Sequence, residues 1–143
     1  MLKSKKDKII YKLTNPFSYT GATVPETASV QGKEVKIKPI VEEFKKREQG
    51  GKLTSQDILF GATLSRLLEN EIQKIINKMN NEEISTEEAE KNMDTWLGII
   101  RASKILNKQE ESVDQRKIEK DEKVRFVKWA KSLLDPALFS YNY

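Results

Sequence analysis

The sequence predicts a mainly α-helical protein: a small bundle of three long helices and one short helix, preceded by an extended or β-hairpin-like N-terminal segment. Two observations support this fold class. Apolar residues recur at steps of three and four after residue 39, which is the helical period. An alternating pattern of apolar and polar residues is confined to the N-terminal part. The 143 residues suffice for one domain with its own core.

The first 38 residues are predicted to be non-helical. Residues 8–13 (KIIYKL) have strand propensity, and residues 33–39 (KEVKIKP) alternate as a half-buried strand does. The link between them, residues 14–32, is rich in Thr, Ser, Gly and Pro, and it is long for a compact domain. We expect either a hairpin with a long loop or an extended basic arm.

The helical patterns follow in order. Residues 39–51 predict a short helix, with Pro39 in its first turn and a Gly pair at its end. Residues 55–80 predict the longest helix, which Thr54 caps. Its apolar stripe consists of Ile58, Leu64, Leu68, Ile72, Ile75 and Met79.

A third helix is predicted from Ser85 to about residue 107. Ser85 and Glu88 have the spacing of a capping box. The stripe behind them includes Ala89, Met93, Trp96, Leu97, Ile100 and Ile105. A fourth helix starts at about residue 112 and ends before Pro136, which disfavours a helical conformation at residue 135. The chain thus divides into a basic arm (1–38), a helical bundle (39–135) and an aromatic tail (136–143).

The composition argues against several functional classes. The chain has neither Cys nor His, and it shows no nucleophile, phosphate-loop or dinucleotide motif. Acidic pairs such as Glu87 and Glu88 lie at predicted helix starts, where the helix dipole favours them. We therefore expect no enzyme, no cofactor and no metal site. No apolar run is long enough to span a membrane, and we expect a cytoplasmic protein.

The aromatic tail is a candidate protein interface. In an extended strand, Phe139, Tyr141 and Tyr143 would point to one side, with Leu138 just before them. These side chains would pack either on the protein's own core or in a groove of a partner. For Trp96 and Trp129, core packing is the first interpretation. The alternative, which we keep for Trp129, is an anchor in an interface.

Basic residues raise a second possibility. The net charge is +4, and residues 1–40 carry eight Lys against three acidic residues. Lysines of the N-terminal segment, together with one arc of the fourth predicted helix, could contact phosphates. The candidates are Lys3, Lys5, Lys6, Lys8, Arg116, Lys120, Lys123 and Lys131. The simpler interpretation is that these charges keep a helical protein soluble.

The sequence therefore predicts a non-enzymatic assembly or adaptor protein that works through protein–protein contacts. Its expected partners are further copies of itself, another protein, or both. A basic arm, a helical body and an aromatic tail form a layout that is common among virus- and phage-encoded assembly factors, so a place in a virion is included. The alternative is a nucleic-acid-binding regulator.

Overall fold

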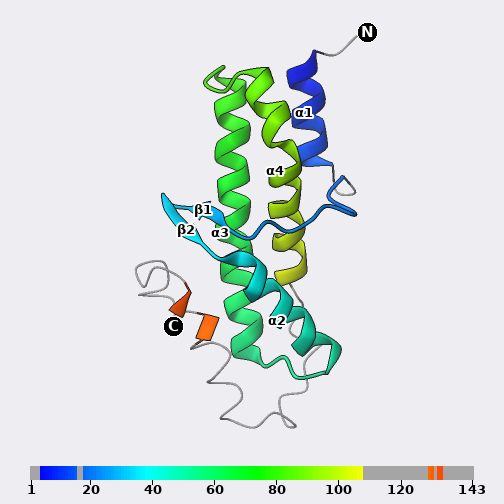
Figure 1. Ribbon diagram of the computed structural model, residues 1–143, viewed down its shortest axis with the longest axis vertical. Helices are drawn as coiled ribbons and strands as arrows, with labels where there is room; N and C mark the ends of the chain where they lie inside the picture. The colour runs from blue at the N-terminus through cyan, green and yellow to red at the C-terminus, as the bar shows by residue number, and fades with distance from the viewer. Residues whose placement is uncertain (1–3, 16–17, 108–128, 131, 134–143) are drawn as a thin grey trace.

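The computed structural model describes residues 4–15, 18–107, 129–130 and 132–133, and it confirms a mainly helical fold with a small N-terminal hairpin. In this part of the chain the elements are α1 (Lys5–Thr14), β1 (Ala28–Val30), β2 (Lys33–Val35), α2 (Ile37–Gln49), α3 (Ser55–Asn80) and α4 (Thr86–Leu106). The two longest helices, α3 and α4, lie antiparallel and side by side (Figure 1). α1 lies along one half of this pair, and the hairpin and α2 lie along the other.

The predicted starts of the two long helices are confirmed. The Thr54 hydroxyl accepts a hydrogen bond from the Asp57 N–H at 3.1 Å, and the Asp57 carboxylate accepts one from the Thr54 N–H at 3.0 Å. This is a complete capping box at the start of α3. At α4 the Ser85 hydroxyl accepts a hydrogen bond from the Glu88 N–H at 3.1 Å. α3 spans the predicted residues, and α4 ends within a residue of its predicted end.

A buried ion pair ties the end of α2 to the start of α3. Asp57 is fully buried, and its carboxylate lies 3.9 Å from the Arg47 Nη1. Arg47 also lies 3.5 Å from the Glu43 carboxylate, one turn earlier in α2. Since a buried carboxylate is stable only when it is paired and hydrogen-bonded, the arginine and the capping bonds fix the position of Asp57.

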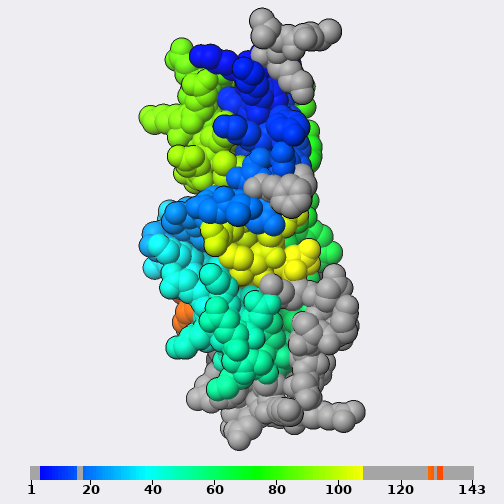
Figure 2. All heavy atoms as spheres, turned by 90° about the vertical axis from the view of Figure 1, so that its right-hand side faces the viewer, coloured from blue at the N-terminus to red at the C-terminus, as the bar shows by residue number. Residues whose placement is uncertain are grey.

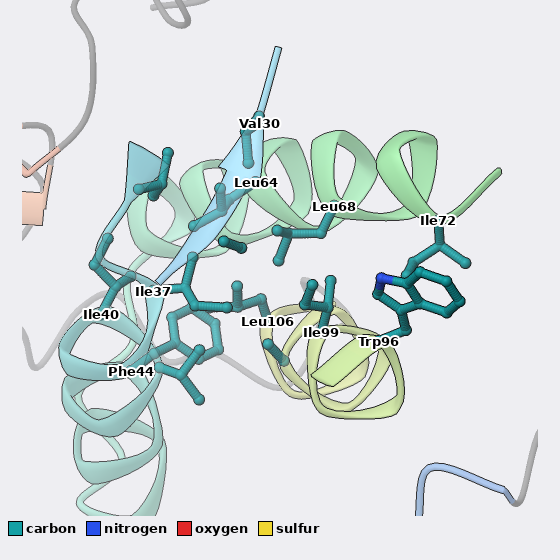
Figure 3. Close-up of a cluster of buried hydrophobic side chains, with 14 of the residues drawn as sticks. Val30, Ile37, Ile40, Phe44, Leu64, Leu68, Ile72, Trp96, Ile99 and Leu106 are labelled. Atoms are coloured by element: carbon teal, nitrogen blue, oxygen red, sulfur yellow. The ribbon is translucent and has the colours of Figure 1, made fainter. Parts of the chain in front are cut away.

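The core fills the space between the α3–α4 pair, the hairpin and α2 (Figure 3). Trp96 is buried there, so the prediction of core packing is confirmed for this tryptophan. The residues labelled in the close-up are Val30, Ile37, Ile40, Phe44, Leu64, Leu68, Ile72, Trp96, Ile99 and Leu106. The core therefore draws on β1, α2, α3 and α4, and it includes Val35 of β2 and Ile9 and Leu13 of α1 as well.

The hairpin differs from the expected one. β1 and β2 pair antiparallel, with Val30 opposite Lys33, so the hairpin lies within residues 28–35. The two-residue turn, Gln31 and Gly32, has φ of +52° and +79°, and such positive values match the right-handed twist of the strands. The Gln31 N–H donates to the Glu71 carboxylate at 3.2 Å, which holds the turn on α3.

The prediction of a strand over residues 8–13 is wrong, because these residues form part of α1. The Ser4 hydroxyl caps α1 by accepting a hydrogen bond from the Asp7 N–H at 3.1 Å. Ile9 and Leu13, four residues apart, are both buried, and this shared burial outweighs the strand propensity of the Ile pair. The predicted strand over 33–39 is also shorter, because the chain enters α2 at Ile37.

The expected fourth helix falls mainly outside the described residues. Of its span, Trp129, Ala130, Ser132 and Leu133 are described. Ala130 is fully buried, and Leu133 packs against the core. The described elements include the helices α1 to α4, and α1 is the one that the sequence did not predict.

Residues 18–27 cross α4 at a point where only glycine fits. A Cβ atom on Gly98 would overlap the carbonyl oxygen of Thr23, and it would lie 2.9 Å from the Pro25 Cδ. Next to this crossing, the Arg101 Nη1 donates to the Ala22 carbonyl at 2.9 Å. We refer to this attachment, made by Ala22, Thr23 and Pro25 on Gly98 and Arg101, as the α4 crossing.

We expect Gly98→Ala to lower the free energy of unfolding by about 2 kcal/mol, because the added methyl group forces the crossing apart. Urea unfolding followed by circular dichroism measures the change. Gly50→Ala is the control, since a Cβ there would find its nearest atom at 3.6 Å. This control should change stability by less than about 1 kcal/mol. Equal losses in both variants would contradict the close approach at Gly98.

Candidate protein-binding groove

The best candidate for a functional site is a groove where the C-terminal end of α1 meets α3 and α4. Its volume is about 290 Å³. We call it the α1 groove. It is lined by Leu13, Thr14, Asn15, Tyr19, Glu69, Ile72, Gln73, Ile76, Ile100, Ser103 and Lys104.

The α1 groove exists because α1 is much shorter than the helices beneath it. The Thr14 hydroxyl donates to the carbonyl oxygens of Ile10 and Tyr11, and the Asn15 N–H donates to the Tyr11 carbonyl, which closes the helix. α3 runs antiparallel to α1 beside this end (Figure 1). Its buried side chains Ile72 and Ile76 line the groove next to Leu13.

A chain of hydrogen bonds between α3 and α4 forms one polar wall of the α1 groove. The Ser103 hydroxyl donates to the Glu69 carboxylate at 3.0 Å, and its oxygen lies 2.8 Å from the Ser65 hydroxyl. Both serines are buried. The Lys104 Nζ lies 3.9 Å from the same Glu69 carboxylate, and both of these side chains are about half exposed.

These features decide what the α1 groove can do chemically. It combines apolar side chains with one fixed carboxylate, one ammonium group and several hydroxyl and amide groups. Such a surface can hold an apolar side chain of a ligand and hydrogen-bond the polar atoms beside it. Among the described residues, no three acidic, His or Cys side chains come together in a way that could hold a metal ion.

The sequence-predicted interface residues are mostly not described. Leu138, Phe139, Tyr141 and Tyr143 lie outside the described residues. Trp129 is described and is 39% exposed. It is therefore not a buried core residue, and core packing, the first interpretation for this side chain, is wrong.

Of the predicted nucleic-acid contacts, too, only some belong to the described residues. Lys5, Lys6 and Lys8 lie on α1, and Lys5 is 3.8 Å from the Glu90 carboxylate of α4. The remaining candidates, Lys3, Arg116, Lys120, Lys123 and Lys131, lie outside the described residues. The structure adds Lys12, which is exposed and lies one turn beyond Lys8.

Sequence reasoning missed the α1 groove itself. Ile72 and Ile100 were predicted as parts of apolar stripes, but nothing in the sequence indicated that a third helix covers those stripes only partly. Ser103 and Glu69 had no motif around them. One pattern in the sequence could have indicated α1. Ser4 is a suitable N-cap, and the apolar residues Ile9 and Leu13 follow it four positions apart, which places them on one face of a helix.

Ser65 and Ser103 should show energetic coupling. We expect Ser103→Ala alone to lower the free energy of unfolding by about 1 to 2 kcal/mol, because it leaves the buried Ser65 hydroxyl without this partner. Ser65→Ala combined with Ser103→Ala should cost about 1 kcal/mol less than the sum of the two single substitutions. Urea unfolding of the four proteins gives the coupling. Additive losses would show that the two hydroxyls do not interact.

Comparison with known proteins gives a family and no activity. The chain belongs to a family of unknown function, DUF5788, whose model matches residues 1–134. All residues of the α1 groove lie within the matched part. Neither a curated protein nor a solved structure matches the chain. Within the part of the chain that the structure describes, no helix has the length and apolar character needed to cross a membrane.

Proposed function

We propose that this protein is a non-enzymatic assembly or adaptor protein that binds other protein chains, copies of itself included. The α1 groove is the observation that carries this proposal. Its volume is about 290 Å³, at the lower end of the range for small-molecule sites. A space of this size suits one or two apolar side chains of a docking protein segment.

Two exposed apolar side chains support the proposal. Leu59 on α3 is 49% exposed, and Trp129 is 39% exposed. Large apolar side chains that remain in contact with water are suitable anchors for a partner, and Trp is enriched among the residues that dominate interface energies. The sequence adds three aromatic residues of the tail as further candidate contacts with a partner: Phe139, Tyr141 and Tyr143.

The biological setting that we propose follows from the layout of the chain. Self-association would make the protein an oligomer, and the layout suits the assembly of a virus or phage particle, with the protein in the cytoplasm or in the virion. This part of the proposal is an analogy of layout.

The solution mass of the full chain tests the proposal. We expect light scattering behind size exclusion to give a multiple of the chain mass in moderate salt. Gln73→Trp should shift the mass toward the monomer, because a bulky side chain at this exposed position obstructs the α1 groove. Asn70→Trp is the matched control, since Asn70 is exposed on the same helix and does not line this groove.

The same measurement separates the groove from the tail. Replacing Phe139, Tyr141 and Tyr143 with Ser should also lower the mass if the tail contributes to the contact. A wild-type chain that remains monomeric at high concentration would exclude self-assembly and leave only a different protein as the partner. An oligomer that none of these substitutions affects would show that neither proposed surface is the interface.

A nucleic-acid-binding regulator is the second candidate, and the exposed lysines of α1 favour it. Lys5, Lys8 and Lys12 are exposed and follow one another at steps of three and four residues, so they lie along one side of the helix. A row of this kind can follow a phosphate backbone. Against it, α4 begins with several acidic residues beside α1, and Lys5 already has a carboxylate neighbour.

Salt-dependent binding distinguishes this candidate. If the lysine row contacts phosphates, Lys8→Glu with Lys12→Glu should lower the salt slope for a single-stranded oligonucleotide by about 0.7 for each lost contact. Fluorescence anisotropy across a salt series gives the slope. Lys74→Glu with Lys78→Glu, the same charge change on exposed positions of α3, is the control. An unchanged slope in the α1 variant would exclude this row as a nucleic-acid site.

A further inference from the structure

α1 is a short helix whose structure depends on what it packs against. It has 10 residues, fewer than the roughly 12 to 15 that an isolated helix needs for marginal stability in water. Its buried side chains are Ile9 and Leu13, with Ile10 half-buried beside them. We call the surface of α3 and α4 beneath Ile9 and Leu13 the α1 seat.

The ion pair that α1 makes with α4 adds little to its attachment. The ion pair between Lys5 and Glu90 is 3.8 Å long, and the two side chains are 77% and 49% exposed. Exposed pairs of this kind contribute about 0 to 1 kcal/mol. The buried side chains of Ile9 and Leu13 therefore contribute more to the contact of α1 with the α1 seat than this ion pair does. By contrast, α3 and α4 bury most of their stripes against each other and against the rest of the core.

The chain is attached again at the α4 crossing, at residues 22–25, after α1 has ended at Thr14. There the Ala22 carbonyl accepts a hydrogen bond from Arg101, and Thr23 lies against Gly98. Figure 2 shows α1 in dark blue beside α4, and the segment from residue 18 on in lighter blue where it crosses α4. Because the crossing holds the chain at residues 22–25, α1 can leave the α1 seat without displacing the hairpin or α2.

Charges of opposite sign meet where α1 lies beside the start of α4, and Lys5 approaches Glu90 there. α1 contains four Lys and one Asp. Residues 82–94, which form the turn before α4 and its first half, contain six acidic residues and one Lys. These charges favour a basic helix at this place over an acidic one, at least at low salt.

We propose that the α1 seat is a binding surface for a basic amphipathic helix of a partner, and that α1 is the chain's own occupant, which this helix displaces. The proposal rests on the proposed function and names the partner's chemistry. The partner helix carries apolar residues at the spacing of Ile9 and Leu13, with lysines or arginines facing α4. It follows the helix-in-groove mode of recognition.

The α1 groove explains how a partner can compete with a tethered helix. α1 has an effective concentration on the order of millimolar, because it belongs to the same chain. It stops at Thr14 and does not fill the groove, in which Ile100 is half-buried while Ile72 and Ile76 are already buried. A partner helix that continues for two more turns, about 11 Å, would cover this groove and gain contact with Ile100 and with the polar side chains of its wall.

A labelled peptide with the sequence of residues 4–15 (SKKDKIIYKLTN) tests the α1 seat in the full-length chain. Ile9→Asp should release the chain's own α1, because it places a charge at a buried position. By fluorescence anisotropy, this variant should bind the peptide at least about tenfold more tightly than the wild type, in which the tethered α1 competes. Tyr11→Asp is the matched control, because it introduces Asp into the same helix at a residue that is 56% exposed. This variant should bind the peptide with the affinity of the wild type.

Two further changes show whether binding has the proposed chemistry. A peptide with Ser in place of both Ile9 and Leu13 should not bind the Ile9→Asp chain. Adding Glu90→Lys to that chain should weaken binding of the original peptide roughly threefold at low salt, the size expected for one exposed ion pair. Equal affinity of the wild-type and Ile9→Asp chains for the peptide would overturn the proposal.

Hydrogen exchange on the wild-type chain provides a measurement that does not depend on the folding of any variant. The amides of Ile9–Thr14 should be protected at least about 100-fold less than those of Leu64–Leu68, because α1 opens locally. If both sets exchange at the same rate, α1 leaves only when the whole protein unfolds, and the proposal is wrong. Failure here leaves the proposed function standing, since the solution mass tests that function without reference to α1 release.

Discussion

The packing of α3 against α4 is the contact on which the rest of the fold depends. The remaining described elements pack on this pair, and two glycines allow the closest approaches to it. A Cβ on Gly61 would lie 2.5 Å from the Leu106 carbonyl oxygen and 2.9 Å from the Phe44 ring, while Gly98 admits the segment that crosses α4. Buried Ser65 and Ser103 add a polar contact inside the apolar interface, which fixes the register of the two helices.

The α1 groove exists because α1 is shorter than α3 and α4. α3 extends for about 39 Å, whereas α1 extends for about 15 Å. A short helix on a long pair leaves a groove at its end, and the walls of this groove include the buried Ile72 and Ile76 and the half-buried Ile100. The same geometry connects the proposed function with the proposed partner helix, because the open groove and the α1 seat are continuous along α3 and α4.

The charge distribution has an explanation within the molecule. The basic N-terminal segment and the acidic middle of the sequence are brought together where α1 lies beside the start of α4, and Lys5 approaches Glu90 there. Exposed charges of opposite sign at this distance stabilise the fold only slightly. They nevertheless favour a basic helix beside the start of α4 over an acidic one. A charge pattern that suggested a nucleic-acid contact in the sequence is therefore also consistent with recognition between helices.

The sequence alone determined the helices whose apolar period is long and whose ends are capped. Thr54 and Ser85 marked the starts of α3 and α4, because N-caps act within one turn of the chain. Only the tertiary structure decided α1 and the α1 groove. Residues 8–13 have the local propensity of a strand, and their helical state depends on burial of Ile9 and Leu13 against residues more than 55 positions away. Such a contact joins distant parts of the chain, and no local pattern encodes it.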